Sequence, residues 1–168
     1  MIRPAFGAWL AKSQPFGAGE QAHFSKAAGR AGLGSCHVDD RMMIAASHAI
    51  ATPEGCIVGS LFQRGEATPL TEATLCASSG TVSAASELTR DYWGDYVAFG
   101  ASRDGRYALR APFGSLPCYW QEAHDHVVLA SSVPLLDAFG GSAPAVDWHA
   151  VGQFIAATDL RNAQIPAA

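Results

Sequence analysis

The four cysteines are the strongest nucleophiles of this chain and its softest potential metal ligands. They are spread through the sequence and form no C-x-x-C pair, whereas zinc sites group their ligands closely and disulfide scaffolds are denser in cysteine. The spacing therefore predicts small buried thiols in a reducing compartment. These cysteines are Cys36, Cys56, Cys76 and Cys118.

Cys36 admits one further hypothesis, because Gly34 and Ser35 precede it. Processing at this junction would free Cys36 as an N-terminal nucleophile whose own amine acts as base. The residues that follow, 37–41, are mostly polar and do not match the strand that such a nucleophile needs. We therefore favour an unprocessed thiol at this position.

Two groups of ionisable residues could bind a metal or transfer protons. His124, Asp125 and His126 have metal-ligating side chains, but they fall in a predicted hairpin turn, where such residues are typical of solvated turns. Asp39 and Asp40 offer paired carboxylates, yet adjacent residues of an extended chain point to opposite faces. The sequence thus predicts a surface turn and a surface acid pair.

The elements that must position these residues are short strands and helices. Apolar alternation between turn residues predicts the strands, and apolar residues at helical spacing predict the helices. The last four strands are expected to form one antiparallel meander, and the whole order is typical of an α+β domain. Trp93, Trp120 and Trp148 are assigned to predicted elements and are expected to be buried. The expected strands are residues 1–10, 42–49, 55–62, 95–101, 106–111, 116–121 and 127–131, and the expected helices are residues 20–28, 83–92, 133–139 and 147–157.

Composition predicts one globular domain over residues 1–168. Of the 168 residues, 49% are hydrophobic and 15% are charged, which is enough apolar surface for a core and too little charge for a disordered chain. The net charge of −4, without a run of Lys or Arg, predicts that nucleic acid is not a partner. No apolar stretch reaches the roughly 20 residues that span a bilayer, so we expect no membrane partner and a cytoplasmic location.

Three segments between residues 92 and 135 carry a family resemblance, because their order and spacing agree together. Residues 93–99, W-G-D-Y-V-A-F, resemble the G-D-F-A-F strand in the glutamine amidotransferase domain of asparagine synthetases. Residues 110–120, R-A-P-F-G-S-L-P-C-Y-W, are similar to that family's R-D-P-x-G-x-x-P-L-Y-Y segment, and residues 128–132 stand where it has x-F-A-S-E. Within this family, the motifs most resemble those of lasso-peptide cyclases.

The resemblance implies a fold and a partner. The fold is of the Ntn-hydrolase type, a four-layer sandwich in which two antiparallel sheets are flanked by helices. The partner is an ATP-dependent, amide-forming ligase domain or subunit. This chain ends at Ala168 without the family's adenylate-binding S-G-G-x-D loop, so we expect no cofactor in it and no ligase activity of its own.

The chain departs from an active glutaminase of this family at three places. The family uses a Cys directly after the initiator Met as nucleophile, and Ile2 stands there. Val58 stands where the family's N-G-E-I-Y-N strand has an oxyanion Asn, while Gly59 keeps a backbone N–H that could bind substrate. The segments that grip glutamine have no convincing counterpart, since residues 79–82, S-G-T-V, lack the family's carboxylate.

These departures predict a degenerate, non-catalytic glutaminase-type domain that supports a ligase of the lasso-cyclase type and can hold its precursor peptide. Two alternatives stay open. The first is an active glutamine-hydrolysing domain that feeds ammonia to asparagine synthesis through an unconventional nucleophile. The second is a free-standing peptide-binding module without a ligase partner.

Overall fold

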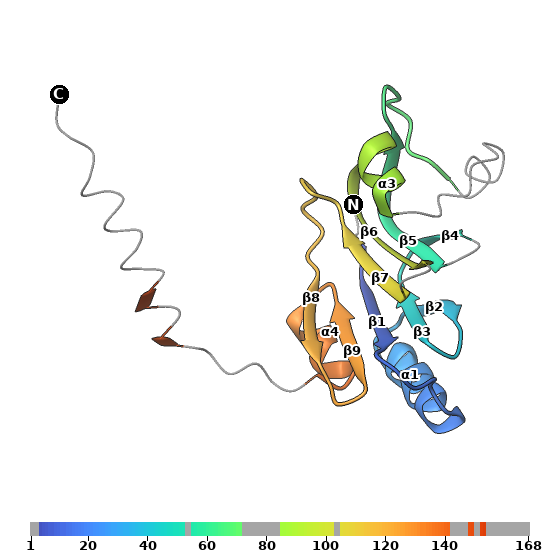
Figure 1. Cartoon of the computed structure of the whole chain (residues 1–168), viewed down its shortest axis with the longest axis vertical. Helices are drawn as coiled ribbons and strands as arrows, with labels where there is room; N and C mark the ends of the chain where they lie inside the picture. Colours follow the sequence, from blue (N-terminus) through green and yellow to red (C-terminus); the bar gives the residue numbers. More distant parts are fainter. Residues whose placement is uncertain are drawn as a thin grey trace.

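Two antiparallel sheets lie face to face at the centre of the computed structural model, which describes residues 4–52, 55–71, 85–102, 105–141, 148–149 and 152–153 (Figure 1). The strands are β1 (Phe6–Ala11), β2 (Gly34–Val38), β3 (Met42–Ala46), β4 (Ala49–Thr52), β5 (Gly55–Gln63), β6 (Tyr92–Ser102), β7 (Gly105–Arg110), β8 (Tyr119–Glu122) and β9 (His126–Ala130). One sheet has the order β2-β3-β1-β9-β8, and the other has the order β4-β5-β6-β7.

The space between the sheets is filled by apolar side chains from alternate positions of the inner strands. Successive side chains of a strand point to opposite faces, so every second residue of β1, β3, β5 and β6 faces the other sheet. Phe6 and Phe99 meet edge to face across this layer, with ring centroids 5.3 Å apart. The buried residues of this inner core are Phe6, Ala8, Met42, Ile44, Ala46, Cys56, Val58, Val97, Phe99, Leu116 and Leu129.

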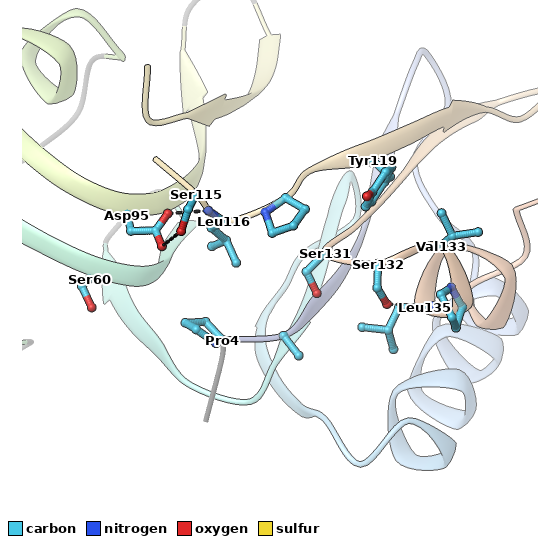
Figure 2. A pocket seen from close by; sticks show the side chains of 13 residues that line it. Pro4, Ser60, Asp95, Ser115, Leu116, Tyr119, Ser131, Ser132, Val133 and Leu135 are labelled. Atoms are coloured by element: carbon cyan, nitrogen blue, oxygen red, sulfur yellow. Dashed lines mark hydrogen bonds between the residues drawn. The ribbon is translucent and has the colours of Figure 1, made fainter. Parts of the chain in front are cut away.

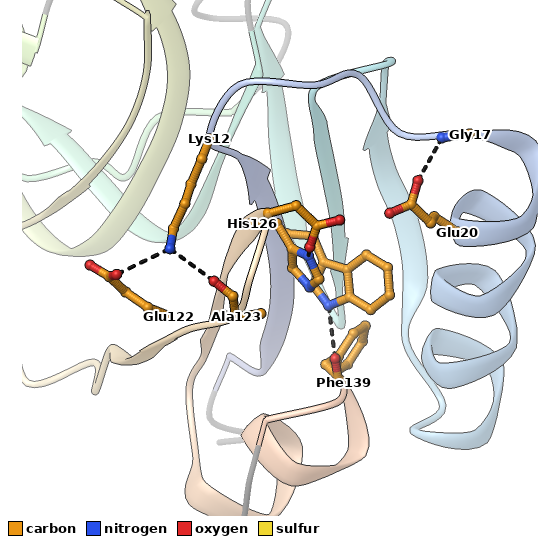
Figure 3. A network of polar contacts seen from close by, with 9 residues as sticks. Lys12, Gly17, Glu20, Glu122, Ala123, His126 and Phe139 are labelled. Carbon is orange, nitrogen blue, oxygen red and sulfur yellow. Dashed lines mark hydrogen bonds and ion pairs between the residues drawn. The ribbon is translucent and has the colours of Figure 1, made fainter.

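Two helices, α1 (Ala18–Arg30) and α4 (Val133–Ala138), cover the outer face of the five-stranded sheet. Trp9 anchors α4 to β1, because its indole N–H donates to the carbonyl oxygen of Phe139 at 2.8 Å (Figure 3). Gly7 makes room for this contact, since a Cβ at that position would lie 2.2 Å from the Phe139 ring. The apolar layer between this sheet and its two helices therefore depends on a glycine at position 7, beside Trp9 and Phe139.

Polar contacts fasten the ends of these elements at the surface (Figure 3). The Lys12 ammonium contacts the Glu122 carboxylate at 3.0 Å and donates to the carbonyl of Ala123 at 2.8 Å, which ties the end of β1 to the β8–β9 turn. The Glu20 carboxylate accepts the N–H of Gly17 at 2.7 Å and caps α1. Exposed pairs such as Lys12–Glu122 contribute little to stability, at most about 1 kcal/mol.

The helix α3 (Ala85–Asp91) covers the outer face of the four-stranded sheet. Leu88 is buried there, and its carbonyl accepts the hydroxyl proton of Tyr96 at 3.0 Å. The predicted α+β class, with two antiparallel sheets and flanking helices, is confirmed. No helix within the described ranges is long and apolar enough to cross a membrane.

The predicted meander is wrong, because its four strands divide between the two sheets. The hairpin β6–β7 lies in the four-stranded sheet, whereas the hairpin β8–β9 lies in the five-stranded sheet. The connection over residues 111–118 crosses between the sheets and buries Leu116 in the inner core. The local pattern placed this leucine in a strand, but its burial between the sheets holds the connection where it crosses from one sheet to the other.

The helices expected at residues 20–28, 83–92 and 133–139 are confirmed as α1, α3 and α4. Of the helix expected at residues 147–157, the structure describes four residues only. The strands β2 and β4 were not predicted. β2 is a mostly exposed edge strand, and β4 was merged with β3 because Ser47 and His48 interrupt the apolar run only briefly.

The predicted burial of three tryptophans is wrong. The exposed fractions of Trp93, Trp120 and Trp148 are 50%, 64% and 75%. Trp93 lies near the start of β6 and Trp120 lies on the edge strand β8, so both extend beyond the packed centre of the sandwich. Trp9, on the central strand β1, is the tryptophan that is buried.

Candidate functional site

A cleft of about 800 Å³ opens between the two sheets, beside the start of β1 and the start of α4 (Figure 2). This volume lies within the roughly 300–1,000 Å³ that is typical of ligand sites. Its walls come from the segment before β1, from β5 and β6, from the loop after β7, and from β8, the end of β9 and α4. The lining residues are Pro4, Ala5, Ser60, Asp95, Ser115, Leu116, Pro117, Tyr119, Ser131, Ser132, Val133, Pro134 and Leu135.

Strands β5 and β6 pass from core to cleft along a single face. Val58 pairs with Val97, and both side chains are fully buried in the inner core. The next pair on this face is Ser60 opposite Asp95, and both residues line the cleft. The strand alternation that builds the core therefore also presents a hydroxyl and a carboxylate to the opening.

A glycine precedes each member of this polar pair and lets the two strands approach. Gly59 and Gly94 have φ values of +109° and +139°, a conformation that side-chain-bearing residues rarely adopt. A Cβ at Gly59 would lie 2.2 Å from the carbonyl oxygen of Asp95, and one at Gly94 would lie 2.2 Å from that of Ser60. The backbone that positions Ser60 and Asp95 thus requires glycine at both sites.

Asp95 and Arg110 both hold the crossing loop, and Figure 2 shows the contacts of Asp95. The Asp95 carboxylate accepts the N–H of Leu116 and, at 2.8 Å, the hydroxyl proton of Ser115. The Arg110 guanidinium donates to the carbonyl oxygens of Gly114 and Leu116, the latter at 2.9 Å. These contacts form the loop clamp, and they join residues 93–99 to residues 110–120.

The opposite wall comes from the end of β9 and the start of α4. The Ser131 hydroxyl is buried and accepts the N–H of Phe6 at 3.0 Å, which ties β9 to β1. Ser132 caps α4 by accepting the N–H of Leu135 at 3.4 Å. With these hydroxyls engaged in structural bonds, Val133 and Leu135 give this wall its apolar character.

An aromatic pair continues the inner face of β5 and β6 beyond the polar pair. Phe62 pairs with Trp93 in the strand register, and the two rings stack with centroids 4.5 Å apart and planes 18° apart. Alternation places both on the face that carries Ser60 and Asp95. Half of the Trp93 surface is exposed, so the stack offers a flat apolar surface next to the cleft.

The lining of the cleft is suited to binding. Among the described residues that line it, Asp95 alone is charged, so the cleft attracts cationic groups. A hydroxyl nucleophile is activated by an adjacent base such as His, Lys or an amine, and the lining within the described ranges contains none of these side chains. The arrangement can hold a ligand that combines a positive charge with an apolar body.

Of the residues predicted from the family resemblance, Val58 and Gly59 lie in the part of the chain that the structure describes. Val58 is fully buried between Ala49 and Val97 in the sheet and is absent from the cleft lining. Gly59 adjoins the cleft residue Ser60. Ile2 and residues 79–82 lie outside the described residues.

The predicted surface turn is confirmed for His124 and Asp125 only, because His126 is the first residue of β9. The turn joins β8 to β9. His126 is mostly buried and packs on Trp9 with ring centroids 4.6 Å apart, while its Nδ1 lies 3.0 Å from the Asp125 carboxylate. In the part of the chain that the structure describes, no group of three His, Cys, Asp or Glu side chains could hold a metal ion.

Asp39 links the two sheets instead of acting with Asp40. Its carboxylate accepts the N–H groups of Arg41 and Met42 at 2.7 and 2.5 Å, and it lies 3.2 Å from both the His37 ring and the Arg106 guanidinium of β7. Burial favours the neutral form of Asp39, but the hydrogen bonds and the Arg106 charge outweigh it and lower the pKa.

The predicted burial of the cysteines is confirmed for Cys56 only. Cys36 and Cys118 are half-buried, and Cys76 lies outside the described residues. Burial raises the pKa of the Cys118 thiol, although the charge of Arg110 opposes this effect. Cys118 therefore stays protonated and unreactive at neutral pH.

Sequence analysis did not identify Asp95, Ser60 or Ser115 as site residues. The two Gly-polar dipeptides, at Gly59 and Gly94, are the signal that could have found them, but their pairing depends on strand register.

Comparisons with protein-family models, curated proteins and solved structures found no match to this chain.

Proposed function

We propose that this chain is a non-catalytic, amidotransferase-like domain of the Ntn-hydrolase type that supports an ATP-dependent, amide-forming ligase similar to lasso-peptide cyclases. The loop clamp is the observation that carries the proposal. Asp95 from one motif segment, and Arg110 and Leu116 from another, meet in one set of hydrogen bonds. This contact gives a physical reason for both motifs to occur together at their spacing.

Two residues, Ile2 by its type and Val58 by its burial, support the absence of glutamine hydrolysis. Ile2 has no nucleophilic atom, and Val58 is buried in the inner core, where an oxyanion donor would be of no use to a substrate in the cleft. Losing one such donor costs about 10²–10³ in rate. We propose that the cleft instead holds a segment of the peptide on which the ligase acts, in the cytoplasm.

Replacing Ile2 tests the catalytic part of the proposal. The Ile2→Cys protein, with removal of Met1 verified by mass spectrometry, should release ammonia from glutamine at the background rate of an Ile2→Ala control. The nucleophile alone is insufficient, because the oxyanion donor and the groups that position glutamine are also missing, and misplacement costs roughly a further 10². Clear glutamine-dependent turnover by Ile2→Cys alone would show that the domain is a glutaminase lacking only its nucleophile.

The ligase association has its own test. The DNA downstream of codon 168, or a neighbouring reading frame, should encode an adenylating domain with an S-G-G-x-D loop. Titration of the isolated chain with Mg-ATP in a calorimeter should give no heat of binding. A micromolar signal, or a gene neighbourhood without any ligase frame, contradicts this association.

A free-standing peptide-binding module is the second candidate, and the Phe62–Trp93 stack beside the cleft favours it. Exposed aromatic surface next to a carboxylate suits a peptide with a basic residue flanked by apolar ones. A tryptophan-free peptide of the form Leu-Lys-Leu should then quench Trp93 fluorescence in the isolated domain, and a Leu-Glu-Leu control should not. Binding without any ligase frame in the gene neighbourhood favours the module.

A further inference from the structure

Cys36 and Cys56 belong to different sheets and lie together at the margin of the inner core. Cys36 is on β2, the edge strand of the five-stranded sheet, at an irregularity of the strand pairing between Ser35 and His37. Its side chain is half-buried and packs against the core cluster that contains the fully buried Cys56 of β5. Cys36 is thus reachable from solvent, whereas Cys56 is enclosed in the core against which Cys36 packs.

The strands that carry these thiols approach each other closely. Packed sheets are typically about 10 Å apart, but Cα atoms of β2 and β5 come within 8 Å of each other here. Disulfides join residues whose Cα atoms are about 4.4–6.8 Å apart. Cys36 and Cys56 lie on these two strands, and β2 is an exposed edge strand of its sheet. A disulfide between them requires the Cα atoms of Cys36 and Cys56 to reach this range.

The thiols also differ in reactivity. A hydrogen bond from the Cys56 thiol, helped by the N–H of Ala46 and opposed by burial, lowers the pKa of Cys36 to about 7. The same hydrogen bond, together with burial and the Cys36 charge, raises the pKa of Cys56. This lowered pKa raises the thiolate fraction of Cys36 at neutral pH above that of an ordinary cysteine, and a thiolate is the attacking species in thiol–disulfide exchange.

We propose that Cys36 and Cys56 form a reversible thiol–disulfide site, in which Cys36 attacks a small disulfide such as glutathione disulfide and Cys56 resolves the product. This inference does not depend on the proposed function. It adds a modification site at the margin of the layer that joins the two sheets.

The exchange balances in two steps. The Cys36 thiolate attacks one sulfur of glutathione disulfide, forms a mixed disulfide and releases one glutathione thiolate. In the mixed disulfide, Cys56 no longer donates a hydrogen bond to a Cys36 thiolate. One cause of the raised pKa of Cys56 is therefore removed. Cys56 then loses its proton and attacks the Cys36 sulfur. The second glutathione leaves, and two protein thiols have been oxidised while one glutathione disulfide has been reduced to two thiols.

Mass spectrometry of the full chain incubated with glutathione disulfide tests the proposal. The wild-type protein should lose two hydrogen atoms in mass, retain no glutathione, yield a Cys36–Cys56 linked peptide after proteolysis, and recover its mass with dithiothreitol. The bond would close a loop of about 20 residues, so the melting temperature should rise by about 5–10 °C.

Matched variants separate the two roles. Cys36→Ser should not react under the same conditions, and Cys118→Ser should behave as wild type. Cys56→Ala should react more slowly, because the hydrogen bond that lowers the pKa of Cys36 is lost, and should stop with one glutathione on Cys36. Any of three results in the wild-type chain overturns the proposal: a stable mixed disulfide on Cys36, a disulfide that joins other cysteines, or no reaction while the urea-unfolded chain reacts.

Discussion

The space between the two sheets has a closed end and an open end, and the same two strands contribute to both. At the closed end, β5 and β6 direct Cys56 and Phe99 into the inner core, and the Asp39–Arg106 pair links the sheets. At the open end, the same face carries Ser60 and Asp95 and then the stacked pair Phe62 and Trp93. Both ends follow from one alternation, so the residue types at successive inner positions decide where packing stops and binding begins.

Substituting asparagine at neighbouring inner positions of β5 should give the largest contrast between the two ends. Val58→Asn places an amide in the apolar core and should lower the free energy of unfolding by about 3–5 kcal/mol, through lost apolar burial and unsatisfied hydrogen bonds. Ser60→Asn, two residues along at the cleft, should change it by less than about 1 kcal/mol. Urea denaturation measures both, and equal losses would show that the open end is packed like the core.

Gly94 tests the backbone at the boundary between the two ends. Gly94→Ala should cost about 2–4 kcal/mol, because the residue has a positive φ and the new Cβ would lie 2.2 Å from the carbonyl oxygen of Ser60. Gly65→Ala is the matched control, since its φ is +90° but nothing lies within 4 Å of the added Cβ. The control substitution should lower the free energy of unfolding by only about 1 kcal/mol. Similar urea midpoints for the two variants would mean that the strand approach at Gly94 relaxes freely.

Asp39 tests the inter-sheet contact at the closed end and its dependence on pH. Asp39→Asn should lower the free energy of unfolding at pH 7 by about 1 kcal/mol, a modest value because the pair is partly solvated. The pKa of Asp39 is lowered from 3.8 in the folded chain, so its ionised form stabilises the protein above that value, and this stabilisation is lost as the pH falls through the folded pKa.

The difference between wild type and Asp39→Asn should therefore shrink in urea titrations at pH 3. Asp40→Asn, at the exposed neighbouring position, serves as control and should change the free energy of unfolding by less than about 0.5 kcal/mol at either pH. A difference that grows at low pH would contradict the direction of the Asp39 shift.

The smallest effect is expected at the outermost pair of the open end. Trp93→Ser should lower the free energy of unfolding by less than about 1 kcal/mol, because half of the ring is exposed and its main contact is the stack on Phe62. Its near-UV circular dichroism should change while the thermal midpoint moves by a few degrees at most. A loss as large as that of Val58→Asn would place Trp93 in the core.

The helices and most strands could be predicted because their signals are local. The alternation in β5 and β6 and the helical spacing around Leu88 and Leu136 depend on residues a few positions apart. The meander failed for a non-local reason: the sheet that β8 joins depends on where Leu116 is buried, and its burial partners come from β1, β5 and β6. The prediction that the tryptophans are buried failed for the same reason. The pattern along a strand does not show whether another layer of the structure covers its side chains.

The candidate site divides in the same way between what the sequence determined and what packing decided. The sequence alone determined that Gly59 and Gly94 could adopt positive φ and that the Val58 side chain could not donate a hydrogen bond, because these are properties of single residue types. Tertiary structure alone decided that Ser60 would pair with Asp95, that Asp95 would clamp the loop at Leu116, and that this face would open as a cleft. A strand determines the direction of its own side chains, but what those side chains meet is set by chain segments distant in the sequence.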